Sequence, residues 1–182
     1  FIGIIDQFNT DRREKLHKLY DSLDENWIYA PASGFEHFHN AIAGGYIDHV
    51  VRVHDFALKV YAFWQQQGMD CDNITQEEVS FAALNHDLGK LGYPGEGNLQ
   101  YVYNDSAWHR KNQGKLYAIN QNIPFMTVPD RSIFLLQQFN IDITYNEYIA
   151  IKVHDGLYDE TNKPYLISRV PTSRPRSYLP YI

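Results

Sequence analysis

Apolar residues recur every three or four positions along several stretches of the chain, which is the spacing of one helical face. The longest stretch runs from Tyr46 to Gln67 and carries a wide apolar stripe of valines and aromatic residues. Gly68 follows it directly, as is typical of a helix end. A shorter stretch, from Asp11 to Leu23, has leucines at the same spacing. The pattern therefore predicts two helices in this part of the chain.

Two further helices are predicted by capping boxes, in which a threonine is followed three residues later by a glutamate. One box covers residues 75–78 and the other covers residues 144–147. Apolar residues continue from the first box to His86-Asp87 and from the second box to His154-Asp155. Each of these helices is therefore expected to end at a histidine that an aspartate follows.

The remaining segments are long connections with weaker signals. Residues 31–45 contain three glycines among aromatic residues and predict a structured loop, and alternating residues 99–103 predict a short hairpin. Helices are expected over residues 106–119 and 130–139, whereas residues 161–176 contain prolines and are expected to be irregular. These elements together predict an all-α bundle with long connecting loops.

Composition narrows the class of protein. With 182 residues, 44% of them hydrophobic, the chain predicts one globular domain, and its start at Phe1 suggests missing residues. No apolar run approaches about 18 residues, so no membrane span or membrane partner is expected. Cys71 is the single cysteine, which excludes an internal disulfide and fits a cytoplasmic protein. The net charge of −6 disfavours extended duplex nucleic acid as a partner, although bound metal ions can reverse a local field.

The adjacent pair His86-Asp87 is the strongest candidate for chemistry, because an imidazole and a carboxylate can bind one divalent metal or bridge two. The two oxygens of Asp87 suit it to bridging. His49 lies upstream beside the valine stripe, and His109 and His154 lie downstream on stretches with helical spacing. Histidines that converge from separate helices are how a helical bundle builds a metal centre.

The other histidines have no matching role. His54 comes five residues after His49 and lies about 140° away on an α-helix, so it should not share the same metal ion. His17 is surrounded by charged residues and is expected to face solvent.

The chain resembles the HD superfamily of metal-dependent phosphohydrolases, and specifically the HD domain of exoribonuclease-like bacterial and phage proteins. The resemblance rests on residues 44–51 around His49, on the run His86-Asp87-Leu88-Gly89-Lys90, and on the later histidines. It covers residues 38–182 and implies an HD-type helical bundle, with residues 1–182 forming one domain truncated at both ends. The final HD aspartate would then lie beyond Ile182, where residues 178–182 look like the start of another helix.

The resemblance also implies a set of metal ligands and two divalent ions. Its ligands would be His49, His86 and Asp87, with His109 and His154 as the extra ligands of the two-metal subset. Relatives have His-His-Gly where this chain has Asp155 after His154, so Asp155 could be a ligand or an outer contact, and His109 could instead be structural. Nitrogen and oxygen ligands without thiolate favour Mn, Mg, Fe, Ni or Co, and Zn fits as well.

Substrate-binding residues follow from the same resemblance. Lys90 matches a lysine taken to meet the substrate phosphate, although it could instead stabilise the end of a helix. His39 could contact a phosphate or order its loop. Residues 161–176 carry no acidic residue, so they form either a solvated loop or a phosphate clamp, for which arginine's planar fork is suited. The arginines of this clamp would be Arg169, Arg174 and Arg176.

The predicted function is a metal-dependent phosphohydrolase, either a phosphomonoesterase or a phosphodiesterase. Its substrate would be a small phosphorylated molecule, a nucleotide or short oligonucleotide, attacked by metal-activated water, with Asp87 and Lys90 as catalytic residues. Two alternatives stay open: a di-iron oxygenase of the same fold and ligand order, and a non-catalytic nucleotide-binding or structural component that retains the fold. The sequence does not indicate an oligomeric state.

Overall fold

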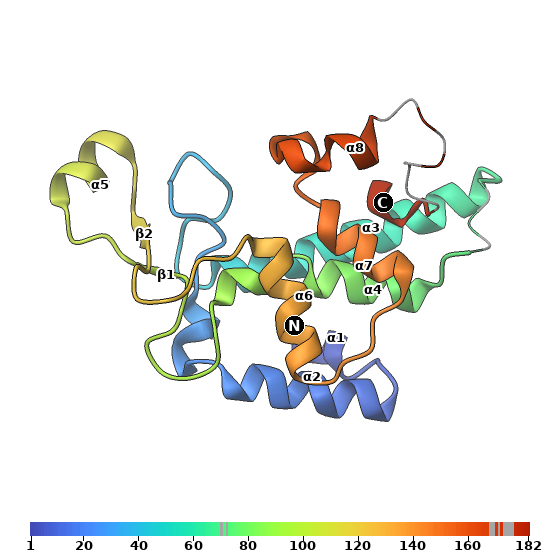
Figure 1. The fold of residues 1–182 in the computed structure, drawn as a ribbon, viewed down its shortest axis with the longest axis horizontal. Coiled ribbons are helices and arrows are strands. Elements are labelled where there is room, and N and C mark those ends of the chain that lie inside the picture. The colour runs from blue at the N-terminus through green and yellow to red at the C-terminus, as the bar shows by residue number, and fades with distance from the viewer. Residues whose placement is uncertain (70, 72, 168–169, 171, 173–176) are drawn as a thin grey trace.

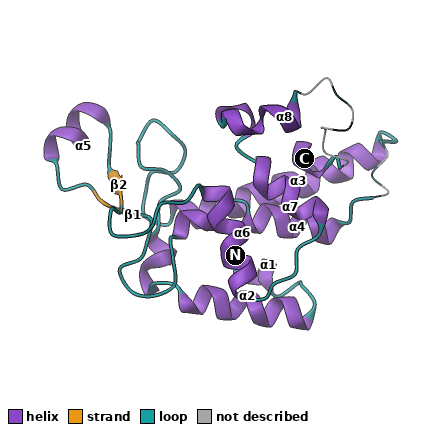
Figure 2. Ribbon diagram, in the orientation of Figure 1, coloured by secondary structure: helices purple, strands orange, loops and turns teal. Residues whose placement is uncertain are grey.

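The computed structural model describes residues 1–69, 71, 73–167, 170, 172 and 177–182. Helices make up most of it, together with one small two-stranded sheet (Figure 2), so the expected all-α class is correct for the helical core and wrong for the sheet. The elements are α1 (Ile2–Ile5), α2 (Thr10–Ser22), α3 (Gly45–Gln66), α4 (Gln76–Asn85), β1 (Tyr101–Tyr103), α5 (Ala107–Gln113), β2 (Tyr117–Ile119), α6 (Val128–Gln138), α7 (Tyr145–Val153) and α8 (Lys163–Leu166).

The core lies between helices that are distant in sequence (Figure 1). Helix α3 packs on α4, α4 packs on α7, and α6 packs on α7 and on the 3-10 turn η2 (Leu88–Leu91). Helices α1 and α2, which precede the segment that carries the family resemblance, add side chains to the same hydrophobic cluster. Fully buried members of the cluster include Ile5, Leu16, Leu19, Val50, Phe81, Leu84, Leu135 and Ile151.

Among the described residues, no helix is both long and apolar enough to cross a membrane.

Helices α4 and α7 lie side by side and run in the same direction: their amino ends are in contact with each other, and so are their carboxyl ends. Both predicted capping boxes form. At the amino ends, the Thr144 hydroxyl donates to Glu78 Oε1 at 2.7 Å, and the Arg12 guanidinium donates to both oxygens of Glu147 at 2.8 and 3.2 Å. The helices have 10 and 9 residues, so their carboxyl ends, each followed by a histidine, also come together.

The segment expected to be a helix over residues 106–119 is the clearest correction to the predicted elements. Ser106 caps α5 as expected, but Gly114 has φ +62° and ends the helix after 7 residues. The chain then forms β2, which pairs antiparallel with β1. The hairpin predicted within residues 99–103 does not form, because those residues supply only one strand and its partner lies beyond α5. We call residues 101–119 the hairpin arm; it projects from the helices at the left of Figure 1. Residues 163–166, expected to be irregular, form α8.

Candidate metal centre

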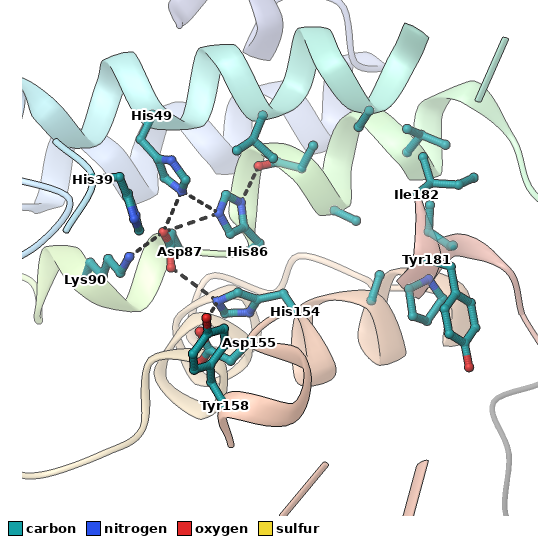
Figure 3. Close-up of a pocket in the computed structure, with 18 residues that line it drawn as sticks. His39, His49, His86, Asp87, Lys90, His154, Asp155, Tyr158, Tyr181 and Ile182 are labelled. Carbon is teal, nitrogen blue, oxygen red and sulfur yellow. Dashed lines mark hydrogen bonds and ion pairs between the residues drawn. The ribbon is translucent and has the colours of Figure 1, made fainter. Parts of the chain in front are cut away.

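Nitrogen atoms from three histidines approach the carboxylate of Asp87, whose side chain is only 2% exposed (Figure 3). Oδ2 of Asp87 lies 3.1 Å from His49 Nε2 and 3.3 Å from His86 Nε2, and these two nitrogens are 3.1 Å apart. Oδ1 lies 3.3 Å from His154 Nε2. The two oxygens of one buried carboxylate therefore face two different groups of donors.

Each of these histidines is positioned by a helix. His49 lies in the first turns of α3, whereas His86 and His154 each follow the last residue of their helix, α4 or α7. His86 Nδ1 is 2.8 Å from the carbonyl of Ala83, and His154 Nδ1 is 2.8 Å from the carbonyl of Ile151. A carbonyl only accepts hydrogen bonds, so each Nδ1 carries the hydrogen. Both rings consequently turn the Nε2 atom toward Asp87, and Nε2 is the nitrogen through which each ring would bind a cation.

The turn after Asp87 is held against α6 by a close backbone approach at Gly89. A Cβ at this glycine would lie 2.2 Å from the carbonyl oxygen of Val128, so no larger residue fits there. The Gly89 amide donates to the Ser132 hydroxyl at 2.8 Å, and that hydroxyl lies 3.2 Å from the carbonyl of His86. Glycine at this position therefore lets α6 fix the backbone that carries His86 and Asp87.

The charges of these groups depend on one another. Burial would raise the pKa of Asp87, but the imidazoles of His86, His154 and His49 together hold that pKa well below its usual range. Burial would lower the pKa of His154, but contact with Asp87 outweighs it and the pKa rises. Burial and the charge of Lys90 lower the pKa of His39. The carboxylate is therefore ionised and His39 is neutral near neutral pH, which are the forms that bind metal ions.

The spacing of the donor atoms fits a metal ion. Bonds of about 2.1 Å place neighbouring ligand atoms about 3.0 Å apart at octahedral corners and about 3.4 Å apart at tetrahedral corners. The separations among His49, His86 and Asp87 Oδ2, 3.1 to 3.3 Å, fall in this interval. Ligand atoms of His39, His49 and Asp87 also lie within 4.8 Å of one another. The cluster could thus hold a metal ion.

Oδ1, the other carboxylate oxygen of Asp87, gives a second reason to expect a cation at this site. Oδ1 is buried and has no hydrogen-bond donor among the described residues, because His154 Nε2 approaches it without the alignment of a hydrogen bond. The same nitrogen lies 3.4 Å from Asp155 Oδ1. A buried carboxylate oxygen without a donor is costly, and a cation between these three residues would remove that cost.

The structure brings most of the predicted ligands together but leaves His109 outside. His49, His86, Asp87, His154 and Asp155 all line one cavity of about 470 Å³. His109, by contrast, is exposed on α5 in the hairpin arm, with its ring 5.2 Å from that of Trp108. The structure therefore does not place His109 with the other predicted ligands, because α5 lies in the projecting arm and His109 does not line the cavity.

The predicted substrate-binding residues are distributed differently. Lys90 lies in the cavity and donates to Asp87 Oδ2 at 2.7 Å, so it meets the carboxylate rather than the end of a helix. His39 is exposed at the rim, with its ring 4.4 Å from that of His49, and thus joins the possible ligands. Arg169, Arg174 and Arg176 lie outside the described residues. Lys163 of the same segment is paired with Glu160 at 2.7 Å.

Sequence reasoning did not include Tyr158 in the site. Its side chain is fully exposed and lies beside Asp155 at the mouth of the cavity (Figure 3). Tyr158 comes four residues after His154, and that helical spacing could have indicated it. The rest of the cavity wall is apolar and consists of Val53, Ala57, Val79, Ala82, Ala83, Ala150, Leu179, Pro180, Tyr181 and Ile182.

His54 faces away from the centre, as its rotation along α3 predicts. It is buried, and its Nε2 lies 2.8 Å from the hydroxyl of Ser80 on α4. Its role is therefore to join α3 to α4.

Comparison with known proteins does not assign the chain. No family model matches it. Searches of curated proteins and of solved structures likewise found no match. The resemblance to the HD superfamily therefore stays a prediction, which rests on the positions of the histidines and aspartates. Any function assigned to the chain has to be argued from the geometry around Asp87.

Proposed function

We propose that this protein is a metal-dependent phosphohydrolase that acts on a nucleotide or a short oligonucleotide. The observation that carries the proposal is the placement of Asp87, whose Oδ2 faces His49 and His86 while its Oδ1 faces His154. A carboxylate between two groups of imidazoles is suited to bridge two cations, and paired cations are characteristic of phosphoryl-transfer sites.

Two cation positions are proposed on either side of this carboxylate. The first would use His49, His86 and Oδ2 of Asp87, with His39 at its rim. The second would use Oδ1 of Asp87 with His154 and Asp155. Asp155 would then fill the ligand position that the sequence assigned to His109. The donor set suits Mn, Mg, Fe, Ni, Co or Zn. When bound, such ions would supply a water nucleophile at neutral pH and neutralise phosphoryl oxygens.

Lys90 is the residue proposed to hold the substrate. Its ammonium is 2.7 Å from Asp87 Oδ2, and its side chain is 14% exposed and lines the cavity. A lysine at this position can bind a phosphate oxygen as a point charge beside the cations. The cavity of about 470 Å³ has the size of a small-molecule site. Roles for Arg169, Arg174 and Arg176 stay predictions.

The test is phosphate or nucleoside monophosphate release from a panel of nucleotides and short oligonucleotides, measured with each candidate metal. Lys90→Ala should raise KM or lower kcat while leaving the metal content unchanged, because Lys90 is assigned to the substrate. Lys18→Ala, which removes an exposed lysine on α2, is the matched control and should have no effect.

Two results would overturn the proposal. Fully metal-loaded protein that releases no phosphate but consumes oxygen with iron would assign the oxygenase chemistry instead. Metal-loaded protein that binds nucleotides without turnover would assign the non-catalytic alternative.

A further inference from the structure

The hairpin arm leaves large apolar side chains uncovered. Tyr103 is 61% exposed and Trp108 is 60% exposed, and Val102 and Ile119 are 41% and 47% exposed. Rings of this size on a projecting hairpin contribute little to the core. Exposed aromatic side chains on a projecting segment are characteristic of a binding surface.

The arm is also basic in an acidic protein. Between Glu96 and Asp130 the sole acidic residue is Asp105, whereas Arg110, Lys111 and Lys115 are basic, in a chain with a net charge of −6. One further carboxylate, that of Glu36, lies against Gly114 at the base of the arm. The arm therefore offers a local positive charge that the chain as a whole lacks.

Two of the cations lie beside aromatic rings. The Arg110 guanidinium lies 4.7 Å from the centre of the Tyr103 ring and donates to the carbonyl of Asn104. Lys115 Nζ lies 5.8 Å from the ring of Phe35. Lys111 is exposed, follows Trp108 by one turn of α5, and makes no ion pair with any described residue. Cations beside exposed rings are the arrangement that binds stacked bases and their phosphates.

The base of the arm adjoins the loop that carries His39 into the metal centre. Phe35 and Lys115 form an isolated antiparallel bridge, and the Glu36 amide donates to the carbonyl of Gly114 at 2.8 Å. The loop then passes Phe38, which is 57% exposed and lies 5.8 Å from the Phe35 ring, and reaches His39. The surface therefore continues from α5 to the rim of the cavity.

We propose that the hairpin arm and residues 35–38 bind single-stranded nucleic acid. Bases would stack on Trp108 and Tyr103, while Lys111 and Lys115 meet the phosphates. An unpaired strand is required because stacking on a side chain needs an accessible base face. Binding itself does not depend on hydrolysis, but delivery of the strand end to the metal centre rests on the proposed function.

The test is fluorescence anisotropy with labelled oligothymidylate and oligouridylate, in the presence of a chelator so that turnover cannot occur. Trp108→Ala should weaken binding by about fivefold or more, as expected for the loss of one stacked base. Lys111→Glu should weaken binding and reduce its salt dependence, since each phosphate contact of a single strand contributes about 0.7 to the slope. The matched controls are Phe63→Ala and Lys59→Glu, exposed positions on α3, which should change neither.

Three outcomes would overturn the inference. The first is that the unaltered protein does not bind the oligonucleotides. The second is that Trp108→Ala and Lys111→Glu leave the binding unchanged. The third is that a polyglutamate peptide binds equally tightly and that its binding is the same in Trp108→Ala. Unfolding curves for each variant show whether a loss reflects folding. Intact binding without any phosphate release would sustain this inference while contradicting the proposed function, so the two can fail separately.

Discussion

At the scale of single residues, Asp87 organises the centre, because ionising a fully buried carboxylate requires compensating charge. His49, His86 and His154 and the ammonium of Lys90 surround it. The sequence could indicate this group from the His-Asp pair and from helical spacing. It could not place His39 or exclude His109, because both lie on segments whose path depends on contacts distant in sequence.

Replacing His154 and replacing His109 should have different effects on the number of bound metal ions. His154→Ala should reduce the bound metal from two ions to one, because it removes the imidazole that faces Asp87 Oδ1. His109→Ala should leave two, because His109 is exposed in the hairpin arm. Elemental analysis of reconstituted protein checks both. Loss of an ion in the His109 variant, with none lost in the His154 variant, would support His109 rather than His154 as the second-metal ligand.

At the scale of elements, the parallel pair α4 and α7 sets the position of the metal centre. The capping boxes that begin both helices were predictable, since threonine and glutamate at this spacing satisfy the first amides of a helix. Their pairing was not predictable, because it depends on Arg12 from a distant helix. Strand β2 was missed for the same reason: residues 117–119 become a strand only through pairing with β1.

Removing Arg12 should destabilise the protein strongly. Its partner Glu147 has a fully buried side chain, so Arg12→Ala would leave a buried carboxylate without its cation, at a cost of about 3 kcal/mol or more. Lys15→Ala is the matched control, because Lys15 pairs with an exposed carboxylate, that of Asp11, and should cost at most about 1 kcal/mol. Urea unfolding measures both free energies. Equal, small effects would show that Arg12 does not hold the helices together.

Glu78 should make stability depend on acid pH. Burial would raise its pKa, but hydrogen bonds from Thr144, Thr75 and Asn146 together hold the pKa below its ordinary value of 4.5. The unfolded chain then binds the proton more readily, so protonation favours unfolding. The stability that Glu78 contributes is present above pH 4.5 and is lost as the pH falls through the lowered folded-state pKa.

The replacement Glu78→Gln tests this pH dependence. The free-energy difference between the original protein and the variant should be larger at neutral pH than at acid pH. Urea unfolding across that pH range measures it, with the exposed Glu14→Gln as control. A difference that stays constant with pH would contradict the assigned role.

At the scale of the whole molecule, an arm that carries aromatic and basic residues projects from the helices of an otherwise acidic chain (Figure 1). The net charge disfavoured extended duplex nucleic acid, yet charge acts locally, and residues 97–129 contain three lysines and arginines but one carboxylate. The helical core was predictable from apolar spacing, whereas the projection of residues 101–119 depends on the turn at Gly114 and on strand pairing.

The most direct test of the account is the metal stoichiometry of the intact protein and of Asp87→Asn, which keeps the shape of the side chain but removes its charge. Calorimetric titration with Mn²⁺, confirmed by elemental analysis, should give two ions per chain for the protein and a loss of both tight sites in the variant. The exposed Asp21→Asn is the control and should retain two. One ion per chain, or two that persist in Asp87→Asn, would contradict a bridging role for Asp87.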